Sequence, residues 1–387
     1  MATRVLVLGA GMVGGVMAAD LAEEPGFEVT IADVREENLA KASARAGGRV
    51  RTVRADLSSP AEIGRLAGGA DLVCGALASR LGFAALRSVI EAGKNYCDIS
   101  FMAEDALELD ELAKARGVTA VVDCGVAPGM SNMCAGAGEA SFDRCEKIEI
   151  YVGGLPRERR WPFQYKAGFA PADVIEEYTR PSRIVEHGRV VVREALSEPE
   201  LMDFGGVGTL EAFNTDGLRS ICRTLHAPFM VEKTLRYPGH IELMRVLRHI
   251  GLFSEEAVEV PGADGGRVLI RPRDVISTLM FPQWTYAPGE EDLTVMRIVV
   301  TGECGGVRER VTWDLLDLYD AKTGATSMSR TTAFPCTIMA RLIAKGEYRR
   351  PGVVVPEFIG REPGVLDRVL QELGRRGVRY SVTRARA

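Results

Sequence analysis

The chain has 387 residues, which is too long for one small hydrophobic core and predicts two domains. Charged residues make up 26% and apolar residues 46%, as in an ordinary globular protein, and the net charge is only −5. The sequence has no basic block, no apolar run of membrane-spanning length and no signal peptide before its first strand, which argues against nucleic acid and membrane as partners. We therefore expect a cytoplasmic protein that acts on a small molecule.

The first motif is a glycine-rich turn between an apolar strand and a helix. Gly9, Gly11 and Gly14 follow the apolar residues 4–8 with the G-x-G-x-x-G spacing of dinucleotide-binding proteins. In that motif the first glycine permits the turn, the second leaves room for a pyrophosphate, and the third lets the helix pack closely on the strand. The N–H groups at the start of the helix then face the phosphates. The alternative is a glycine-rich turn of some other α/β unit.

The predicted cofactor site extends to the ends of the next strands. The strand at residues 27–33 ends in Asp33, about 20 residues past the glycines, where a carboxylate holds the ribose hydroxyls. Because this carboxylate repels a 2′-phosphate, we predict NAD rather than NADP, with Arg35 as the residue that argues for NADP. Asp56 is interpreted either as a contact to adenine or as a helix-start signal. The predicted cofactor residues are Gly9, Gly11, Met12, Val13, Gly14, Asp33, Val34, Arg35, Asp56, Ala76 and Leu77.

Strands and helices alternate through the first third of the chain. The expected strands are 4–8, 27–33, 50–56, 70–77, 95–100 and 119–124, and the expected helices are 36–46, 61–67, 82–92 and 104–116. This alternation is typical of a doubly wound parallel sheet, in which ligands bind beyond the carboxyl ends of the strands. Asp33, Asp56, Asp98 and Asp123 all fall at those ends and indicate a crevice lined by acids.

A domain boundary is predicted at Pro128 and Gly129, which interrupt the pattern. We expect a Rossmann domain at 1–128, an α+β substrate-binding and dimerisation domain at 129–328, and a C-terminal segment at 329–387 that returns to the first domain. The middle region should hold strands at 147–154, 183–186, 189–193, 294–302 and 308–318 and helices at 171–177, 216–224, 240–251 and 272–281. The two longest strands would leave an edge or an apolar face exposed, so we predict a homodimer.

The cysteines and histidines predict no metal site. The eight cysteines include no C-x-x-C pair, and none of the four histidines is spaced to a cysteine as in a zinc site. Cys74, Cys97 and Cys124 each lie at a predicted strand end, where a nucleophilic thiol is conceivable. We favour buried, reduced cysteines instead.

Several longer motifs make the chain resemble the saccharopine dehydrogenase-like family, and within it the L-lysine 6-dehydrogenases. These motifs are Asp123–Met130, Tyr151–Pro156, Leu210–Thr215, Lys233–His240, Arg271–Val275 and Arg330–Ala333. The resemblance covers essentially the whole chain and implies a Rossmann domain, a substrate domain that also dimerises, and NAD(P)-linked chemistry at a carbon–nitrogen bond. The chain departs from the lysine 6-dehydrogenases at residues 100–102 and 166–167, both of which would lie near the substrate.

Amine oxidation requires a neutral nitrogen, and the ε-amine of lysine has a solution pKa of about 10.4, so the site must take up a proton. Asp98 and Asp123 are candidate catalytic acids at strand ends, and His240 is a candidate proton shuttle. A helix cap or loop hydrogen bond is the alternative for each aspartate. For His240 the alternative is an ordinary histidine in a turn.

An amino-acid substrate also presents a carboxylate, which arginine binds through its bidentate fork. Arg219 and Arg236 are the candidates, with Asn214 and Thr215 as hydrogen-bonding neighbours. Lys233 either pairs with an acid of the crevice or lies on the surface.

The favoured function is that of an NAD(P)-dependent dehydrogenase that oxidises the ε-amine of L-lysine to the semialdehyde. The near alternative is a saccharopine- or carboxyspermidine-type enzyme, for which the arginine-rich loop at 157–160 could supply a second carboxylate contact. The alternative from another class is a non-catalytic NAD(H)-sensing Rossmann protein. A sensor would need no second polar site facing the nicotinamide.

Overall fold

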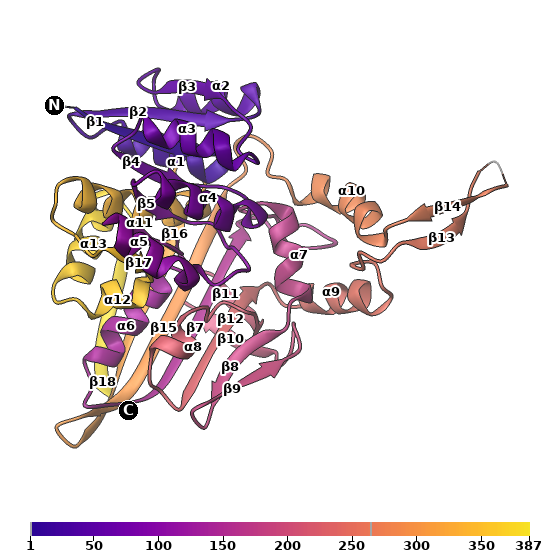
Figure 1. The fold of residues 1–387 in the computed structure, drawn as a ribbon. Helices are drawn as coiled ribbons and strands as arrows, with labels where there is room; N and C mark the ends of the chain where they lie inside the picture. Colours follow the sequence, from indigo (N-terminus) through magenta and orange to yellow (C-terminus); the bar gives the residue numbers. More distant parts are fainter. Residues whose placement is uncertain (1, 264) are drawn as a thin grey trace.

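Two sheets dominate the computed structural model, which describes residues 2–263 and 265–387 (Figure 1). The first sheet consists of β1 (Thr3–Leu8), β2 (Phe27–Asp33), β3 (Arg51–Arg54), β4 (Leu72–Gly75), β5 (Asn95–Asp98), β6 (Thr119–Val121) and β17 (Gly352–Val354). Its strands are all parallel, in the order β17-β6-β5-β4-β1-β2-β3. From β1 the chain adds β2 and β3 on one side and then β4, β5 and β6 on the other, so the direction of strand addition reverses between β1 and β4. The turn after β1 therefore lies at the point where such sheets bind ligands.

Helices cover both faces of this sheet. They are α1 (Met12–Leu21), α2 (Glu36–Arg45), α3 (Pro60–Gly68), α4 (Ser79–Glu91), the 3-10 helix η1 (Ala106–Leu109) and α5 (Asp110–Arg116). Along β1, Val5 and Val7 join one core cluster while Leu6 and Leu8 join another. Because successive side chains of a strand point to opposite faces, this division shows a sheet buried on both sides. The predicted doubly wound fold with a second α+β domain is confirmed.

The second sheet is mixed. Its strands are β7 (Arg144–Pro156), β8 (Ser182–Glu186), β9 (Arg189–Arg193), β10 (Glu200–Phe204), β11 (Gly208–Asn214), β12 (Phe229–Arg236), β15 (Asp292–Cys304), β16 (Val307–Leu318) and β18 (Tyr380–Arg386). The main path is β10-β11-β12-β7-β15-β16-β18, with β7 and β12 parallel. Both β15 and β16 therefore have a neighbouring strand on each side along most of their length, so neither is an open edge strand for a second subunit.

The C-terminal segment, from residue 327 onward, joins the two sheets. Its helices are α11 (Ser327–Ala344), α12 (Pro356–Arg361) and α13 (Val365–Arg375), and helix α6 (Met130–Ala140) from earlier in the chain packs against α12. Helix α11 is buried along nearly its whole length and contacts α1, β4 and β5 on one side and β15 on the other. A helix that is buried all round belongs to the core of a large unit. After α11 the chain adds β17 to the parallel sheet and β18 to the mixed sheet.

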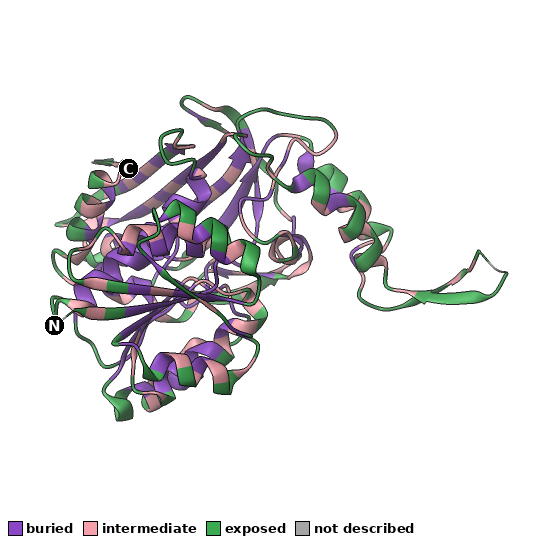
Figure 2. Ribbon diagram, turned by 90° about the horizontal axis from the view of Figure 1, so that it is seen from above, coloured by how far each residue is buried: buried purple, intermediate pink, exposed green. Residues whose placement is uncertain are grey.

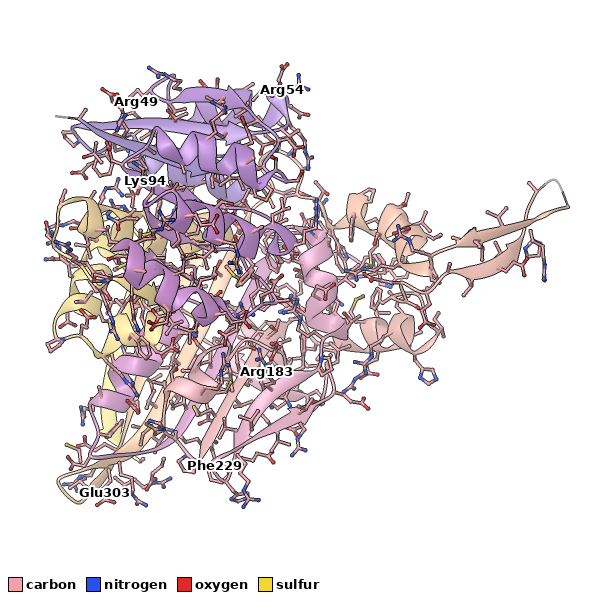
Figure 3. The ribbon with its side chains drawn as sticks, viewed as in Figure 1. Arg49, Arg54, Lys94, Arg183, Phe229 and Glu303 are labelled. Atoms are coloured by element: carbon pink, nitrogen blue, oxygen red, sulfur yellow. The ribbon has the colours of Figure 1, made fainter. Side chains whose placement is uncertain are left out.

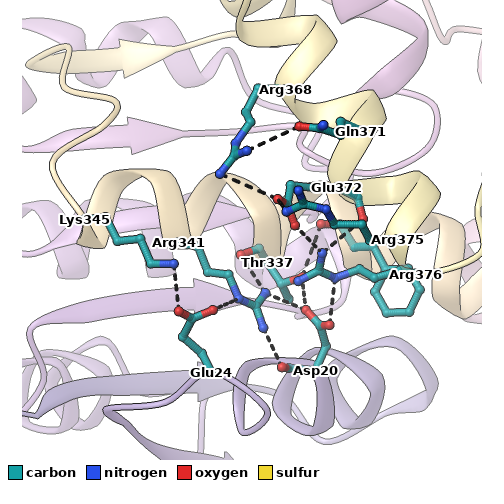
Figure 4. Close-up of polar contacts among 11 residues, drawn as sticks. Asp20, Glu24, Thr337, Arg341, Lys345, Arg368, Gln371, Glu372, Arg375 and Arg376 are labelled. Atoms are coloured by element: carbon teal, nitrogen blue, oxygen red, sulfur yellow. Dashed lines mark hydrogen bonds and ion pairs between the residues drawn. The ribbon is translucent and has the colours of Figure 1, made fainter.

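An ion-pair network ties the C-terminal helices to α1 (Figure 4). Asp20 of α1 accepts hydrogen bonds from Arg341 Nη1 of α11 at 2.6 Å and from Nε of Arg376, which caps the C-terminal end of α13, at 2.8 Å. Glu24, in the turn that follows α1, accepts from Arg341 Nε at 2.9 Å and pairs with Lys345. These contacts fix the first helix of the glycine motif against the tail of the chain.

Most of the remaining elements form a projecting arm (Figures 1 and 2). The arm consists of α7 (Pro171–Thr179), α9 (His240–His249), α10 (Pro272–Trp284) and the hairpin of β13 (Val258–Pro261) and β14 (Arg267–Ile270), whereas the short α8 (Ile221–Thr224) packs near β8 of the mixed sheet. The hairpin and α10 extend away from the body and are largely exposed. The helix expected at 216–224 is shorter than predicted, because Arg219 has a left-handed backbone conformation (φ 56°) that no α-helix contains.

Candidate functional site

One cavity of about 640 Å³ lies between the carboxyl ends of the parallel strands and the mixed sheet. Every residue predicted to bind the cofactor lines it: Gly9, Gly11, Met12, Val13, Gly14, Asp33, Val34, Arg35, Asp56, Ala76 and Leu77. The opposite wall is made by β7, α7, β12 and residues 215–217. The cavity therefore connects the glycine turn directly with the second domain.

The glycine turn has the shape that a pyrophosphate requires. Gly9 has φ +95°, and a Cβ there would lie 2.4 Å from the carbonyl oxygen of Ala76. A Cβ on Gly14 would lie 1.9 Å from the carbonyl oxygen of Gly9, whereas a Cβ on Gly11 would meet nothing within 4 Å. The first turn of α1 carries no side-chain cap, so its N–H groups remain available for phosphate oxygens. These residues fit the pyrophosphate of NAD(P).

Asp33 is tied to this turn by its own hydrogen bonds. Its Oδ2 accepts from the backbone N–H of Ala10 at 2.8 Å, and its Oδ1 accepts from the backbone N–H of Arg35 at 2.8 Å. The carboxylate is thus held at the cavity wall, where it can meet a ribose. The Arg35 guanidinium lines the same wall and, among the described residues, forms no ion pair. Arg35 is placed to receive a 2′-phosphate, so the preference for NAD stays a prediction.

The two candidate catalytic aspartates lie behind the cavity wall and do not line it. Asp98 ends β5, and its Oδ1 accepts from Ser100 Oγ at 2.7 Å and from Tyr96 Oη at 3.2 Å. Burial raises the pKa of Asp98 to about 7. Asp123 forms a buried ion pair with Arg219 at 3.1 Å. Their roles in proton transfer stay predictions, and each would need an opening toward the cavity to reach a substrate.

His240 is buried in a hydrogen-bonded chain away from the cavity surface. Its Nδ1–H donates to the Phe163 carbonyl oxygen at 2.8 Å, and its Nε2 accepts from Tyr178 Oη at 2.9 Å. Burial and the nearby Arg236 lower the pKa of His240 to about 3. The ring is therefore neutral, and its hydrogen bonds hold Tyr178 beneath Arg236.

The predicted substrate residues divide into two groups. Thr215 and Arg236 line the cavity, whereas Asn214, Arg219 and Lys233 do not. Asn214 donates to Ser197 Oγ at 3.1 Å, and Lys233 pairs with Glu200 at 2.8 Å on the far side of the sheet from the cavity wall. Arg219 donates to the Met102 carbonyl oxygen at 2.6 Å and stacks over the Phe101 ring.

The structure adds five acids and one arginine that the sequence interpretation missed. They line the mixed-sheet side of the cavity and are Asp173, Glu176, Glu177, Arg180, Asp216 and Glu232. The helical spacing of residues 173, 176, 177 and 180 is a signal that could have been found, because side chains three and four apart share one face of a helix. Glu232 gave no such signal, since a single acid in a strand is ordinary.

Arg236 is held rigidly at the centre of this wall. Its Nη2 pairs with Glu177 at 2.6 Å, its Nε donates to Tyr178 Oη at 3.2 Å, and its guanidinium lies 4.4 Å above the Tyr165 ring. Burial raises the pKa of Glu177, although the arginine opposes this effect. The pair therefore forms part of the wall and supplies one positive and one negative charge to it.

No metal site accompanies the cavity: within residues 2–263 and 265–387, no three histidine, cysteine, aspartate or glutamate side chains gather as a metal ion would require. All eight cysteines are free thiols. Over the same residues, no helix combines the length and apolar character needed to cross a membrane. The cytoplasmic location stays a prediction.

The glycine turn, the parallel sheet and the connected cavity define an NAD(P)-dependent oxidoreductase of the Rossmann type. Comparison with known families specifies the class further. Residues 5–121 match the model of the saccharopine dehydrogenase NADP binding domain, and residues 125–378 match that of the saccharopine dehydrogenase C-terminal domain. The chain therefore belongs to the saccharopine dehydrogenase family, as its resemblance implied.

Individual relatives are distant. The chain is 22% identical to the mitochondrial alpha-aminoadipic semialdehyde synthase of Mus musculus over 91% of its own length, and it spans only 45% of that relative. It is 21% identical to the NADP(+)-dependent, L-glutamate-forming saccharopine dehydrogenase of Saccharomyces cerevisiae, over 96% of this chain and 97% of the relative.

A solved structure shares the fold of the whole chain. Apo saccharopine dehydrogenase (L-Glu forming) from S. cerevisiae matches with a TM-score of 0.82 at 18% identity, covering 99% of this chain and 100% of that one. The assignment to lysine 6-dehydrogenases within the family stays a prediction.

Proposed function

We propose that the protein is an NAD(P)-dependent dehydrogenase that oxidises the ε-amine of L-lysine to the semialdehyde and releases ammonia. One observation carries the proposal: the mixed-sheet side of the cavity holds more carboxylates than cations. The acids are Asp173, Glu176, Glu177, Asp216 and Glu232, and the cations are Arg180 and Arg236.

The excess persists after acids with partners outside the cavity are set aside. Glu176 pairs with Arg273 at 2.6 Å, and Asp216 pairs with Arg183 of β8, which is labelled in Figure 3, at 2.8 Å. Three acids then face two arginines, so a bound cation, which favours the ionised form of each acid, meets a wall with one surplus negative charge. Lysine carries two ammonium groups and one carboxylate and therefore complements this wall.

Saccharopine fits the same wall poorly, because it carries more carboxylates than amines. Its additional carboxylates would need cations, and the arginine-rich loop at 157–160 does not provide them. Arg157 pairs with Glu291, Arg160 pairs with Glu290, and Arg159 stacks over the Tyr237 ring. None of these arginines lines the cavity.

A carboxylated polyamine is the second candidate substrate class. It carries one carboxylate and several amines, so the surplus of acids supports it on the same grounds as lysine. Such a substrate is oxidised at a secondary amine, and the reaction releases an amine instead of ammonia. The product therefore separates the two candidates.

The residues of the cavity support the chemistry as follows. Bound NAD(P) would supply the hydride acceptor. Arg180 is partly exposed, and among the acids of the described chain it pairs only with Glu176, at a distance of 3.9 Å. It is therefore the cation best placed for a substrate carboxylate. Ile99, Phe101, Val126 and Met328 line the cavity and exclude water from the reacting carbon.

The test is turnover by the purified protein. L-Lysine with NAD or NADP should generate the reduced cofactor together with an equal amount of ammonia and without any added oxo-acid. Because juxtaposed like charges cost several kcal/mol, kcat/KM for lysine should exceed that for saccharopine by at least about tenfold. Turnover of saccharopine without turnover of lysine would refute the proposal and leave the family unchanged.

We also propose that the protein is a homodimer joined through the projecting arm. Exposed apolar side chains gather there: Leu243, Val246, Ile250, Val258, Val268, Leu269, Val275 and Leu279. A hairpin of two strands is at best marginally stable alone, and an apolar patch of this kind marks a contact site. A second copy of the chain offers the same patch, as a two-fold interface requires.

A further inference from the structure

Glu232 stands out among the acids on the mixed-sheet side of the cavity because it is buried and, within the described residues, forms no ion pair. It lies on β12 with an exposed fraction of only 3%, yet it lines the cavity. The neighbouring strand β7 contributes Gly153 and Gly154 to the same wall. Gly217 makes room for the carboxyl group, because a Cβ on Gly217 would lie 2.4 Å from Glu232 Oε2.

The hydrogen bonds of Glu232 use only one of its two oxygens. Oε2 accepts from Thr215 Oγ1 at 2.6 Å and from the backbone N–H of Gly217 at 3.0 Å. Within the described residues, Oε1 accepts no hydrogen bond, and its surface is not fully covered by protein atoms. The free oxygen is therefore in contact with the cavity, and the other oxygen fixes its orientation.

The other acids of this wall are differently placed. Glu177 pairs with Arg236, Glu176 pairs with Arg273, and Asp216 pairs with Arg183. Asp173 has no ion pair in the described chain, but it is partly exposed to solvent. Only at Glu232 do burial, an oriented free oxygen and the lack of a cation coincide among the acids that line the cavity.

We propose that Glu232 binds the reacting ammonium of the substrate and accepts its proton before hydride transfer. This inference rests on the proposed function, since it takes a cationic amine as the substrate class. Thr215 and Gly217 act as positioning groups that hold the carboxylate toward the cavity. An unpaired carboxylate that faces a binding site is a natural partner for an ammonium group, because the buried ion pair then satisfies both charges.

The step balances in atoms and charge. The ammonium N–H bond breaks, its proton moves to Oε1 of Glu232, and the amine nitrogen keeps the electron pair. That pair forms the C=N bond as a hydride leaves the carbon for the oxidised nicotinamide, which gains two electrons. Water then adds to the iminium, ammonia leaves, and Glu232 returns its proton to solvent. The overall reaction consumes the ammonium form of the substrate, oxidised cofactor and water and yields the aldehyde, an ammonium ion, reduced cofactor and one proton.

The acid–base properties of Glu232 suit this role. Burial, together with the nearby Glu177 and Asp216, raises the pKa of Glu232 to about 8, while the hydrogen bonds from Thr215 and Gly217 oppose the shift. A base is most effective when its pKa lies near the working pH. The carboxyl group is therefore mostly neutral in the free protein at pH 7, and binding of an ammonium group should expel its proton.

The experiment compares Glu232→Gln with a matched control, Glu357→Gln. Glutamine retains an oxygen that can accept from Thr215 and Gly217, so the fold is preserved while the proton acceptor is lost. Glu357 is also a buried acid with a raised pKa that accepts from a threonine, Thr224, but it lies on α12 and does not line the cavity. Glu232→Gln should lower kcat for L-lysine by about 10²–10⁴, and Glu357→Gln should leave it within about threefold.

Two further readouts separate a proton acceptor from a structural residue. In the wild-type protein kcat/KM for lysine should rise as pH increases through about 8, and this inflection should vanish in Glu232→Gln. Calorimetric titration of the NADH-bound protein with L-lysine, in two buffers of different ionisation enthalpy at pH 7, measures the protons released on binding without any turnover. The wild type should release nearly one proton and Glu232→Gln none, with the affinity for NADH equal in both proteins.

These outcomes distinguish the inference from the proposed function. If lysine is oxidised and Glu232→Gln retains kcat and proton release, the role of Glu232 is refuted and the lysine assignment stands. If lysine neither reacts nor binds, the lysine assignment is refuted, and the same variants are measured with saccharopine and 1,5-diaminopentane. Loss of proton release with whichever of these amines binds supports Glu232, and retention of the release, or failure of every amine to bind, overturns it.

Discussion

Arg236 offers a sharp test of how the cavity wall is built. The sequence marks it as a carboxylate-binding residue, whereas in the structure it is engaged with Glu177, Tyr165 and Tyr178 and its side chain is only 3% exposed. Replacing it by methionine removes the cation but keeps most of its apolar volume. Glu177 is then left in the wall without its partner. Arg236→Met should therefore lower the stability of the protein more than it weakens substrate binding.

The expected size follows from burial. Removing one partner of a buried ion pair costs about 3–5 kcal/mol, whereas an exposed pair is worth about 0–1 kcal/mol. Because the Glu177 side chain is 21% exposed, we expect the lower end of the buried range, about 3 kcal/mol. Glu177→Gln in the Arg236→Met background should recover part of this loss, since it removes the uncompensated carboxylate.

Urea unfolding of the wild type, both single variants and the double variant measures this coupling. A loss below about 1 kcal/mol for Arg236→Met, together with a higher KM for lysine at unchanged kcat, would refute the reasoning. That result would mean that Arg236 is available to the substrate and that its contacts with Glu177 contribute little.

Further predictions concern the cofactor, pH and assembly. Gly11→Val should weaken NADH binding by more than about tenfold with an unchanged melting temperature, because its Cβ meets open space, whereas Gly14→Val should unfold the turn by clashing with Gly9. We expect a higher kcat/KM with NAD than with NADP, and Arg35→Ser should reduce only the NADP rate; a clear preference for NADP would contradict the role given to Asp33. The pKa of Glu232 is raised in the folded protein, so the wild type should lose stability relative to Glu232→Gln as pH rises from about 4.5 to about 8. Above about pH 8 the difference should stay constant, and thermal melts of both proteins measure it. Sedimentation should show a dimer that Leu269→Asp converts to a 41.9 kDa species, and a wild-type protein that sediments only as 41.9 kDa would exclude the dimer.

The Rossmann part was predictable from local pattern. Gly9, Gly11 and Gly14 lie in one turn, and the strand that ends in Asp33 follows at the spacing that this fold imposes, so sequence distance maps directly onto spatial distance. The residues predicted to bind the cofactor all line the cavity for this reason. Their positions depend on contacts between chain segments that are close in sequence.

The substrate side was harder to predict because it depends on long-range pairing. Glu232 reaches the cavity through the parallel pairing of β12 with β7, which no local pattern in the sequence reveals. Asp98 and Asp123 lie at strand ends as expected, but a strand end says nothing about whether a side chain points into the cavity or behind it. The tail was also incompletely anticipated, since β18 joins the mixed sheet.

The most direct test of the central claim uses L-lysine labelled with ¹⁵N at the ε-nitrogen. Incubated with the purified protein and oxidised cofactor, it should yield one ¹⁵N-ammonium for each reduced cofactor formed, because we propose that the acid-lined wall receives the ε-amine. Unlabelled ammonium would show that the α-amine is oxidised instead. Reduced cofactor formed from saccharopine, with no ammonium released from lysine, would contradict the account of the substrate.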